Sequence, residues 1–247
     1  MSLTKLETKR ILFEDEHFIA VHKHAGELVV KDRFGLEKNV LLDSVGNYLR
    51  ELGHQKDKSG RDLYPVHRLD RDTSGIVLFA KHQEAHRALS ILFEGRTVKK
   101  IYWTFACGIP VWDSCVCNVP LQRAEGKKGR GRGLIALKSG KPSSTQFFVR
   151  EQFGDVVWIE AHPHTGRLHQ IRLHLKILGH PVMFDSYYGE TKWTSKVFPT
   201  FPIQRLALHA REIHFEHPVT KKKIVIECPL DEDIRNLLNT LKGPQGQ

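Results

Sequence analysis

An aspartate placed between two arginines is the feature of this sequence best suited to chemistry. Asp70 lies in the polar run 67–75, between Arg68 and Arg71, and the apolar segment 76–80 follows directly. Fixed cations favour the ionised form of a neighbouring carboxylate, which keeps it available as a nucleophile or a base. The same residues also suit a plain surface turn in which Asp70 only pairs with Arg68 or Arg71. The rest of the sequence has to decide between these interpretations.

A second constellation of polar side chains lies in residues 166–172, Gly-Arg-Leu-His-Gln-Ile-Arg. The pattern predicts a helix that opens at Gly166 and Arg167, where unpaired N–H groups and a cation would suit an anion. His169 and Arg172 are three residues apart, so we expect them to share a helix face. A structural helix with ordinary charged flanks is the alternative.

Neither the histidines nor the cysteines have the spacing of a metal site. The histidines of this region do not follow the His-Glu-x-x-His pattern and have no acidic or cysteine ligand among them: His162, His164, His169 and His174. The four cysteines do not form two metal-spaced pairs, and we expect reduced thiols: Cys107, Cys115, Cys117 and Cys228. The sequence therefore predicts no bound metal.

The charge balance points to a polyanionic partner. Lysine and arginine total 38 against 28 acidic residues, which gives a net charge of +10 and a pI near 9.5. The glycine-rich segment 126–133 concentrates cations without any apolar residue, and we predict that it binds RNA through Lys127, Lys128, Arg130 and Arg132. A second basic run, 221–223, suits either a solvated turn between two strands or an RNA contact.

Composition limits the class of protein. With 40% hydrophobic and 27% charged residues, the 247-residue chain is expected to be globular. No apolar run approaches the ~20 residues that a membrane-spanning helix needs. The N-terminus lacks the apolar core of a signal peptide. We therefore expect a cytoplasmic protein that does not associate with membranes.

Hydrophobic periodicity gives the elements that must position these residues. Residues 11–23 suit two short strands around an acidic turn, and further strands are expected at 100–106, 145–150 and 156–161. Helical spacing occurs at 40–52, 83–94, 168–178 and 231–241. The mixture predicts an α+β architecture. We expect an N-terminal tail at 1–10, a single domain at 11–242 and a disordered tail at 243–247.

Several blocks in a fixed order resemble the pseudouridine synthases, in the branch that acts on uridines of large-subunit ribosomal RNA and of tRNA. Residues 67–75 are similar to the family's catalytic aspartate loop, 100–102 to its Lys-x-Tyr strand and 165–174 to its third motif. The remaining blocks are 179–182, Asp185 with Tyr188-Gly189, 205–210 and His217-Pro218. The sequence departs from the family at His24, where proline is usual. With strands expected from residue 11, we also expect no room before them for the small RNA-binding domain that many relatives carry.

The resemblance implies a fold and a reaction. The fold would be a mostly antiparallel, bent mixed sheet in two lobes, with flanking helices and a basic central cleft. The reaction would convert specific uridines of ribosomal or transfer RNA to pseudouridine. It breaks the N1–C1′ bond, turns the uracil and rejoins it through C5, without redox change and without a cofactor. RNA would be the partner of a monomeric enzyme.

The resemblance also implies a role for each candidate residue. Asp70 would be the catalytic carboxylate, Arg172 or Arg167 the cation that keeps it ionised, with Arg172 favoured, and Tyr102 the side chain that stacks on the target base. The target uridine would have to leave its stack to reach the carboxylate. Further contacts to RNA are expected from Arg68, Arg71 and His169.

Two other classes of function fit parts of the sequence. Asp70-Arg71-Asp72-Thr73 partly matches the Asp-x-Asp-x-Thr loop of phosphohydrolases, but its threonine directly follows the second aspartate and the loop precedes its strand. A non-catalytic RNA-binding module is the other alternative. Against that alternative, the sequence retains all the candidate catalytic residues: Asp70, Tyr102, Arg167 and Arg172.

Overall fold

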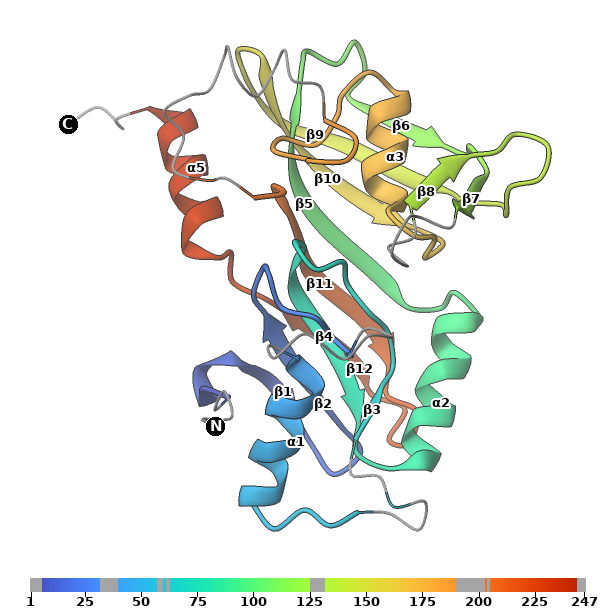
Figure 1. Cartoon of the computed structure of the whole chain (residues 1–247), viewed down its shortest axis with the longest axis vertical. Helices are drawn as coiled ribbons and strands as arrows, with labels where there is room; N and C mark the ends of the chain where they lie inside the picture. The colour runs from blue at the N-terminus through green and yellow to red at the C-terminus, as the bar shows by residue number, and fades with distance from the viewer. Residues whose placement is uncertain are drawn as a thin grey trace. The chain divides into compact units, whose positions relative to one another are not determined.

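The chain folds into two compact units, each built from segments that are separate in the sequence (Figure 1). The computed structural model describes residues 6–31, 40–56, 60, 63–124, 132–189, 203 and 205–243. The first unit consists of Met1–Lys99 and Ala210–Pro229, and the second of Lys100–His209 and Leu230–Gln247.

The first unit is a mostly antiparallel sheet with two helices. A short 3-10 helix, η1 (Thr8–Arg10), precedes the first strand. The strands of this unit are β1 (Ile11–Glu14), β2 (Phe18–Lys23), β3 (Tyr64–Pro65), β4 (Ser74–Ala80), β11 (Leu208–Glu216) and β12 (Lys223–Glu227). The strand order is β1-β2-β4-β11, with β3 beside β4 and β12 beside β11. The helices are α1 (Leu41–Glu51) and α2 (Gln83–Glu94).

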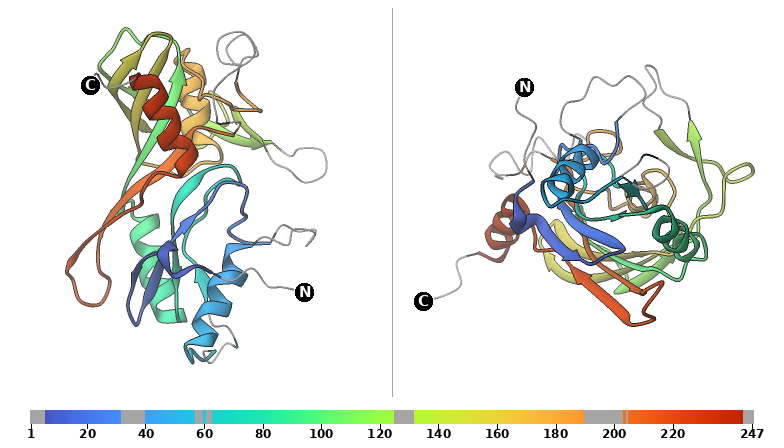
Figure 2. Two further views of the ribbon diagram at one scale, coloured as in Figure 1. Left: turned by 90° about the vertical axis from the view of Figure 1, so that its left-hand side faces the viewer. Right: turned by 90° about the horizontal axis from the view of Figure 1, so that it is seen from below.

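The second unit has four antiparallel strands of the ten-stranded sheet, in the order β5-β10-β9-β6. Its strands are β5 (Lys99–Cys107), β6 (Ser114–Cys117), β9 (Thr145–Phe153) and β10 (Val156–Pro163). A separate two-stranded ribbon is formed by β7 (Leu121–Ala124) and β8 (Arg132–Ile135). Helices α3 (Gln170–Ile177) and α5 (Glu232–Lys242) lie against the strands of this unit (Figure 2).

Each unit has its own hydrophobic core. In the first, Ala85 and Leu89 of α2 pack against Ile76 and Leu78 of β4, and every residue of β4 is buried. In the second, Ile171 and Leu175 of α3 join Ile234 and Leu237 of α5 in one cluster with the inward side chains of β5, β9 and β10. These cores fix the positions of the strand ends and helix ends that carry the candidate site residues.

The structure confirms the expected α+β fold with a large, mostly antiparallel sheet, and the expected helices occur close to their predicted bounds. The predicted start of the third helix was wrong, because α3 begins at Gln170 rather than at Gly166. The single domain at 11–242 and the basic central cleft stay predictions.

Two further expectations meet the structure only in part. Residues 125–131, with Lys127, Lys128 and Arg130, lie outside the described residues, while Arg132 and Gly133 belong to strand β8 and not to a loop. Among the described residues, no helix is both long enough and apolar enough to cross a membrane.

Candidate active site

Asp70 lies in a tight turn between β3 and β4 of the first unit. The backbone N–H of Thr73 donates to the carbonyl of Asp70 (3.2 Å), which closes the turn. Leu69, 7% exposed, anchors one side of the turn in the protein, and Thr73, 2% exposed, anchors the other. The Asp70 side chain between them is half-buried. The turn therefore presents a carboxylate at the edge of a rigid, fully buried strand.

The buried side chain of Lys23 stabilises this turn by hydrogen bonds to backbone carbonyls. Lys23, at the end of β2, is 0% exposed, and its ammonium group donates to the carbonyls of Arg71 (2.8 Å), Thr73 (2.7 Å) and His24 (3.0 Å). The N–H of Gly26 donates to the same Arg71 carbonyl (2.9 Å). Three carbonyl acceptors satisfy all three ammonium donors, so the cation is tolerated in the interior. The clamp fixes the backbone on the C-terminal side of Asp70.

Gly75 allows the end of the turn to approach β11 closely. Its φ is +116°, a conformation that residues with a side chain rarely adopt. A Cβ at this position would lie against the backbone oxygen of Ala210 and 2.5 Å from its nitrogen. Only glycine fits without moving one of the two strands.

The other polar residues of the run 67–75 have separate roles. The His67 ring stacks on Phe93 (centroids 4.9 Å apart), and its Nε2 accepts from the N–H of Leu78 (3.1 Å). Arg68 and Arg71 are exposed, and Arg71 Nε donates to the carbonyl of Gly26 (3.2 Å). Exposed guanidinium groups beside the turn suit the predicted RNA contacts.

Arg172, on α3 of the second unit, is held by a bidentate ion pair. Its Nε and Nη2 donate to the two carboxylate oxygens of Asp185, both at 2.7 Å, and the exposed fractions of the two side chains are 5% and 0%. Burial would raise the pKa of Asp185, but the Arg172 guanidinium and the N–H groups of Tyr187 and Tyr188 outweigh it and lower that pKa below its usual value. Because Asp185 binds both Nε and Nη2, it fixes the plane of the Arg172 guanidinium group.

Arg167 lies before the helix, in a segment that is locked by side-chain hydrogen bonds. Gln170 Oε1 accepts from the hydroxyl of Thr165 (2.6 Å) and from the N–H of Arg167 (2.9 Å). Arg167 Nε donates to the carbonyl of Pro142 (3.2 Å) at the surface. His169 precedes the helix in a left-handed conformation (φ +55°) and does not share a helix face with Arg172, contrary to the sequence prediction.

Tyr102 lies on β5, paired with Ala161 of β10. Its side chain is half-buried and packs against the core of the second unit. An aromatic ring held on one side by a core and exposed on the other can offer a flat surface to a base.

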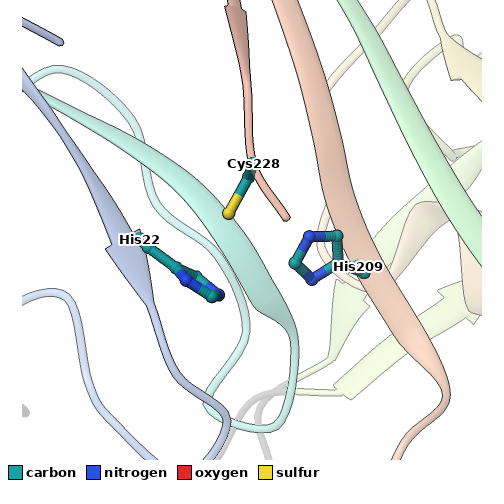
Figure 3. Close-up of side chains that lie close together, drawn as sticks. All are labelled: His22, His209 and Cys228. Carbon is teal, nitrogen blue, oxygen red and sulfur yellow. The ribbon is translucent and has the colours of Figure 1, made fainter. Parts of the chain in front are cut away.

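Three of the four histidines weighed as metal ligands have other side-chain partners: His162, His169 and His174. His174 is buried between the hydroxyls of Ser143 (3.1 Å) and Thr145 (3.0 Å), and His162 pairs with Glu160 (2.6 Å). A different group, whose ligand atoms lie within 4.8 Å of one another, is made by His22, His209 and Cys228 (Figure 3). Imidazole and thiolate are ligands of Zn²⁺, and the expectation of no metal stays a prediction. The four cysteines are free, and burial, helped by Cys117, raises the pKa of Cys115 to about 11.

Sequence reasoning missed three residues that shape the candidate site: Lys23, Asp185 as the partner of Arg172, and the hydroxyl of Tyr188. Lys23 and Arg71 are 48 residues apart, and Asp185 follows Arg172 by 13 residues, outside any helical or strand spacing. In the sequence Lys23 follows His22 at the end of β2, and no local pattern there marks the lysine as buried.

Comparison with known proteins shows the family that the chain resembles. The family model described as RNA pseudouridylate synthase matches residues 17–176. Ribosomal large subunit pseudouridine synthase C of Vibrio cholerae is 37% identical, over 94% of this chain and 69% of its own length. Its counterpart from Pasteurella multocida is 38% identical over 95% of this chain and 68% of its own length.

Solved structures give the same fold. Human RNA pseudouridylate synthase domain containing 4 aligns with a TM-score of 0.76 at 22% identity, over 95% of this chain and 94% of that chain. Human RNA pseudouridylate synthase domain containing 1 aligns with a TM-score of 0.67 at 25% identity, over 94% of each chain.

Proposed function

The chain belongs to the RNA pseudouridylate synthase family, and we propose that this RNA pseudouridine synthase modifies uridines of large-subunit ribosomal RNA with Asp70 as its catalytic residue. The relatives at 37% and 38% identity are both named as synthases of the large ribosomal subunit, which supports the choice of RNA. The observation that carries the choice of Asp70 is the construction of its turn. A buried ammonium group and a glycine with a positive φ fix a half-buried carboxylate at the end of a buried strand.

The proposed reaction is an isomerisation that needs only a carboxylate and proton transfers. The N1–C1′ bond breaks, the uracil turns, a C5–C1′ bond forms, and the hydrogen on C5 leaves as a proton while N1 gains one. Asp70 can add to the uracil, attack C1′ or take the ribose 2′ proton, and each route uses its ionised form. The target uridine is expected to leave its stack, at a cost of a few kcal/mol that stacking and phosphate contacts offset.

We assign the supporting cation to Arg172 rather than to Arg167. Arg172 is buried and its plane is set by two hydrogen bonds to Asp185, so it can present a charge without reorganisation. Arg167 is more exposed and donates Nε to a backbone carbonyl at the surface, which suits a contact to RNA. Tyr102 would stack on the target base.

The proposed substrate is tested by mapping pseudouridines in large-subunit ribosomal RNA from cells with and without the gene. We expect one or a few positions to lose the modification in the deletion strain and to regain it with the wild-type gene but not with Asp70→Asn. An unchanged map of that RNA, with positions lost from tRNA instead, would contradict the choice of substrate and leave the enzyme class standing.

The remaining alternatives are separated in vitro. Release of tritium from a [5-³H]uridine-labelled transcript should occur in excess EDTA, whereas an aspartate phosphohydrolase needs Mg²⁺ and acts on phosphate esters. A non-catalytic RNA-binding module would bind the transcript and release no tritium.

A further inference from the structure

The hydroxyl of Tyr188 holds the β7–β8 ribbon to the rest of the second unit. It accepts from the N–H of Gly133 (3.0 Å) and donates to the carbonyl of the same residue (3.1 Å). The N–H and the C=O of Gly133 are therefore both paired with one side chain, as they would be with the backbone of a neighbouring strand. Tyr188 is 6% exposed and forms a small core cluster with Leu121 of β7 and Leu173 of α3.

Gly133 sits so close to α3 that no side chain fits there. A Cβ at this position would lie 2.5 Å from Cδ1 of Leu173 and 2.6 Å from the carbonyl oxygen of Leu168. The ribbon is thus seated on the segment that leads into α3, and its contact is specific to one residue of β8. Figures 1 and 2 show β8 beside α3.

A third partner completes the hydroxyl's hydrogen bonding. Nδ1 of His169 lies 2.8 Å from the Tyr188 oxygen. A phenol has one proton to donate and can accept two hydrogen bonds. Since the proton goes to the Gly133 carbonyl, the bond to His169 is satisfied when Nδ1 carries the hydrogen. The left-handed backbone of His169 (φ +55°), unusual for a residue with a side chain, is held in part by this bond.

The ring of Tyr188 contacts the proposed catalytic cation. The guanidinium carbon of Arg172 lies 5.1 Å from the centre of the ring, within the range of a cation–π contact. The Tyr188 N–H also donates to Asp185 Oδ1 (3.0 Å), the oxygen that accepts from Arg172 Nη2. One residue thus contacts Arg172 through its ring and the ribbon through its hydroxyl.

The ribbon carries exposed cations. Arg123 and Arg132 are exposed on its two strands, Lys138 and Lys141 follow it, and it brackets the predicted RNA-binding segment. Because these groups lie on or next to the ribbon, the position of the ribbon would set the position of any phosphates that they bind.

We propose that Tyr188 is a positioning residue for RNA, which fixes the basic β7–β8 ribbon relative to Arg172 so that RNA bound by the ribbon enters the reaction in a defined register. This inference rests on the proposed function, because it assumes that the ribbon contacts the substrate RNA. Loss of the hydroxyl alone should loosen the ribbon and leave the ring beneath Arg172 in place.

The test is Tyr188→Phe, measured by filter binding and by tritium release on a transcript of large-subunit ribosomal RNA. We expect binding to weaken by about three- to thirtyfold, the range over which such couplings act, with KM raised in proportion and kcat within about twofold of wild type. The salt dependence of binding should become less steep. Tyr48→Phe in the first unit, which loses a surface hydrogen bond to Glu14, is the matched control and should match wild type.

A double-mutant cycle with Arg123→Gln/Arg132→Gln separates positioning from packing. If the hydroxyl acts through the ribbon's charges, Tyr188→Phe should weaken binding little further once those charges are gone. Equal losses in both backgrounds, an unchanged affinity, or a lower kcat at unchanged KM would overturn the proposal. If Tyr188→Phe melts far below wild type, His169→Asn is measured in the same way, because asparagine tolerates the positive φ of this position. We expect this variant to lose less binding than Tyr188→Phe, in the same direction. Because the proposal is decided by binding, a wild-type protein that binds the transcript but releases no tritium counts against the proposed function alone.

Discussion

The carboxylate oxygens of Asp70 are the atoms on which the proposed chemistry depends. Asp70→Asn keeps the size of the side chain and its ability to accept hydrogen bonds, but an amide can act neither as nucleophile nor as base at neutral pH. We expect tritium release to fall below about 1% of wild type, with RNA affinity within a few-fold. The turn itself should survive, because Lys23 and Gly26 bind backbone carbonyls rather than the Asp70 side chain.

The controls for Asp70→Asn are its melting temperature and the variant Asp72→Asn, two residues along in the same turn. Asp72→Asn removes an equal charge and should retain most activity. Turnover above a few percent in Asp70→Asn would show that another group performs the chemistry. A large loss of stability would instead favour a structural role for the aspartate.

Arg172 is tested by Arg172→Met, which keeps much of the side chain's length and removes its charge. If Arg172 is the cation that supports the proposed chemistry, kcat should drop steeply and the acid limb of the pH–rate profile should move to higher pH. Arg167→Met, the matched variant, should raise KM and leave the acid limb in place. The opposite pattern would assign the supporting cation to Arg167.

The same substitution changes Asp185, and this effect has a distinct pH dependence. The pKa of Asp185 is lowered in the folded protein, so its ionisation stabilises the fold above the unfolded-state value and that contribution is lost as pH falls. In Arg172→Met the buried carboxyl keeps its desolvation but loses its cation, so its pKa should rise and acid unfolding should begin at higher pH. Asp185→Asn in the Arg172→Met background removes this stability effect, and any shift of the acid limb that remains belongs to catalysis.

At the scale of elements, the approach of β4 to β11 at Gly75 decides where the Asp70 turn lies. Gly75→Ala should lower the free energy of unfolding by about 2 kcal/mol or more, from the strained φ together with the overpacking against Ala210. Gly53→Ala is a matched control, since Gly53 has a φ of +85° and nothing within 4 Å of the added Cβ. Urea denaturation of both variants measures the difference. Equal losses would show that the two strands separate easily at this point.

Local sequence patterns were sufficient for the described α-helices and for several strands, but not for the hydrogen-bonding partners of the candidate residues. The helix at Gln83–Glu94 was predicted with its exact bounds, because apolar spacing and the following Gly95 are both local signals. The start of α3 was misplaced because Gln170 turns its side chain back to Thr165 and Arg167, and also donates to Ser144, which is 26 residues away. The partners of Lys23 and Asp185 were not predicted for the same reason, since their hydrogen bonds join segments that only the tertiary fold brings together.

At the scale of the whole molecule, the candidate residues are divided between the two units. Asp70 belongs to the first, Tyr102 and Arg172 to the second, and the chain passes from one unit to the other three times, at residues 99–100, 209–210 and 229–230. Neither unit is a continuous segment that could be cut out of the sequence. Activity should therefore depend on the whole chain, and substitutions are better tests than truncations.

The net charge of +10 should act mainly on RNA binding, and its densest segment gives the most direct test. Replacement of Lys127, Lys128, Arg130 and Arg132 with serine removes four cations from a stretch of eight residues that has no apolar side chain to contribute to a core. If all four contact phosphates of single-stranded or distorted RNA, the slope of log affinity against log salt should become less steep by about 0.7 per contact. Turnover at saturating RNA should change little, because these residues are not expected to touch the reacting base. Serine replacement of Lys221 and Lys222, just before β12, and of Lys223, its first residue, gives a control of similar charge loss. A slope that changes equally in both variants would mean that only net charge matters, whereas a change confined to the first would assign the RNA contacts to the segment between β7 and β8.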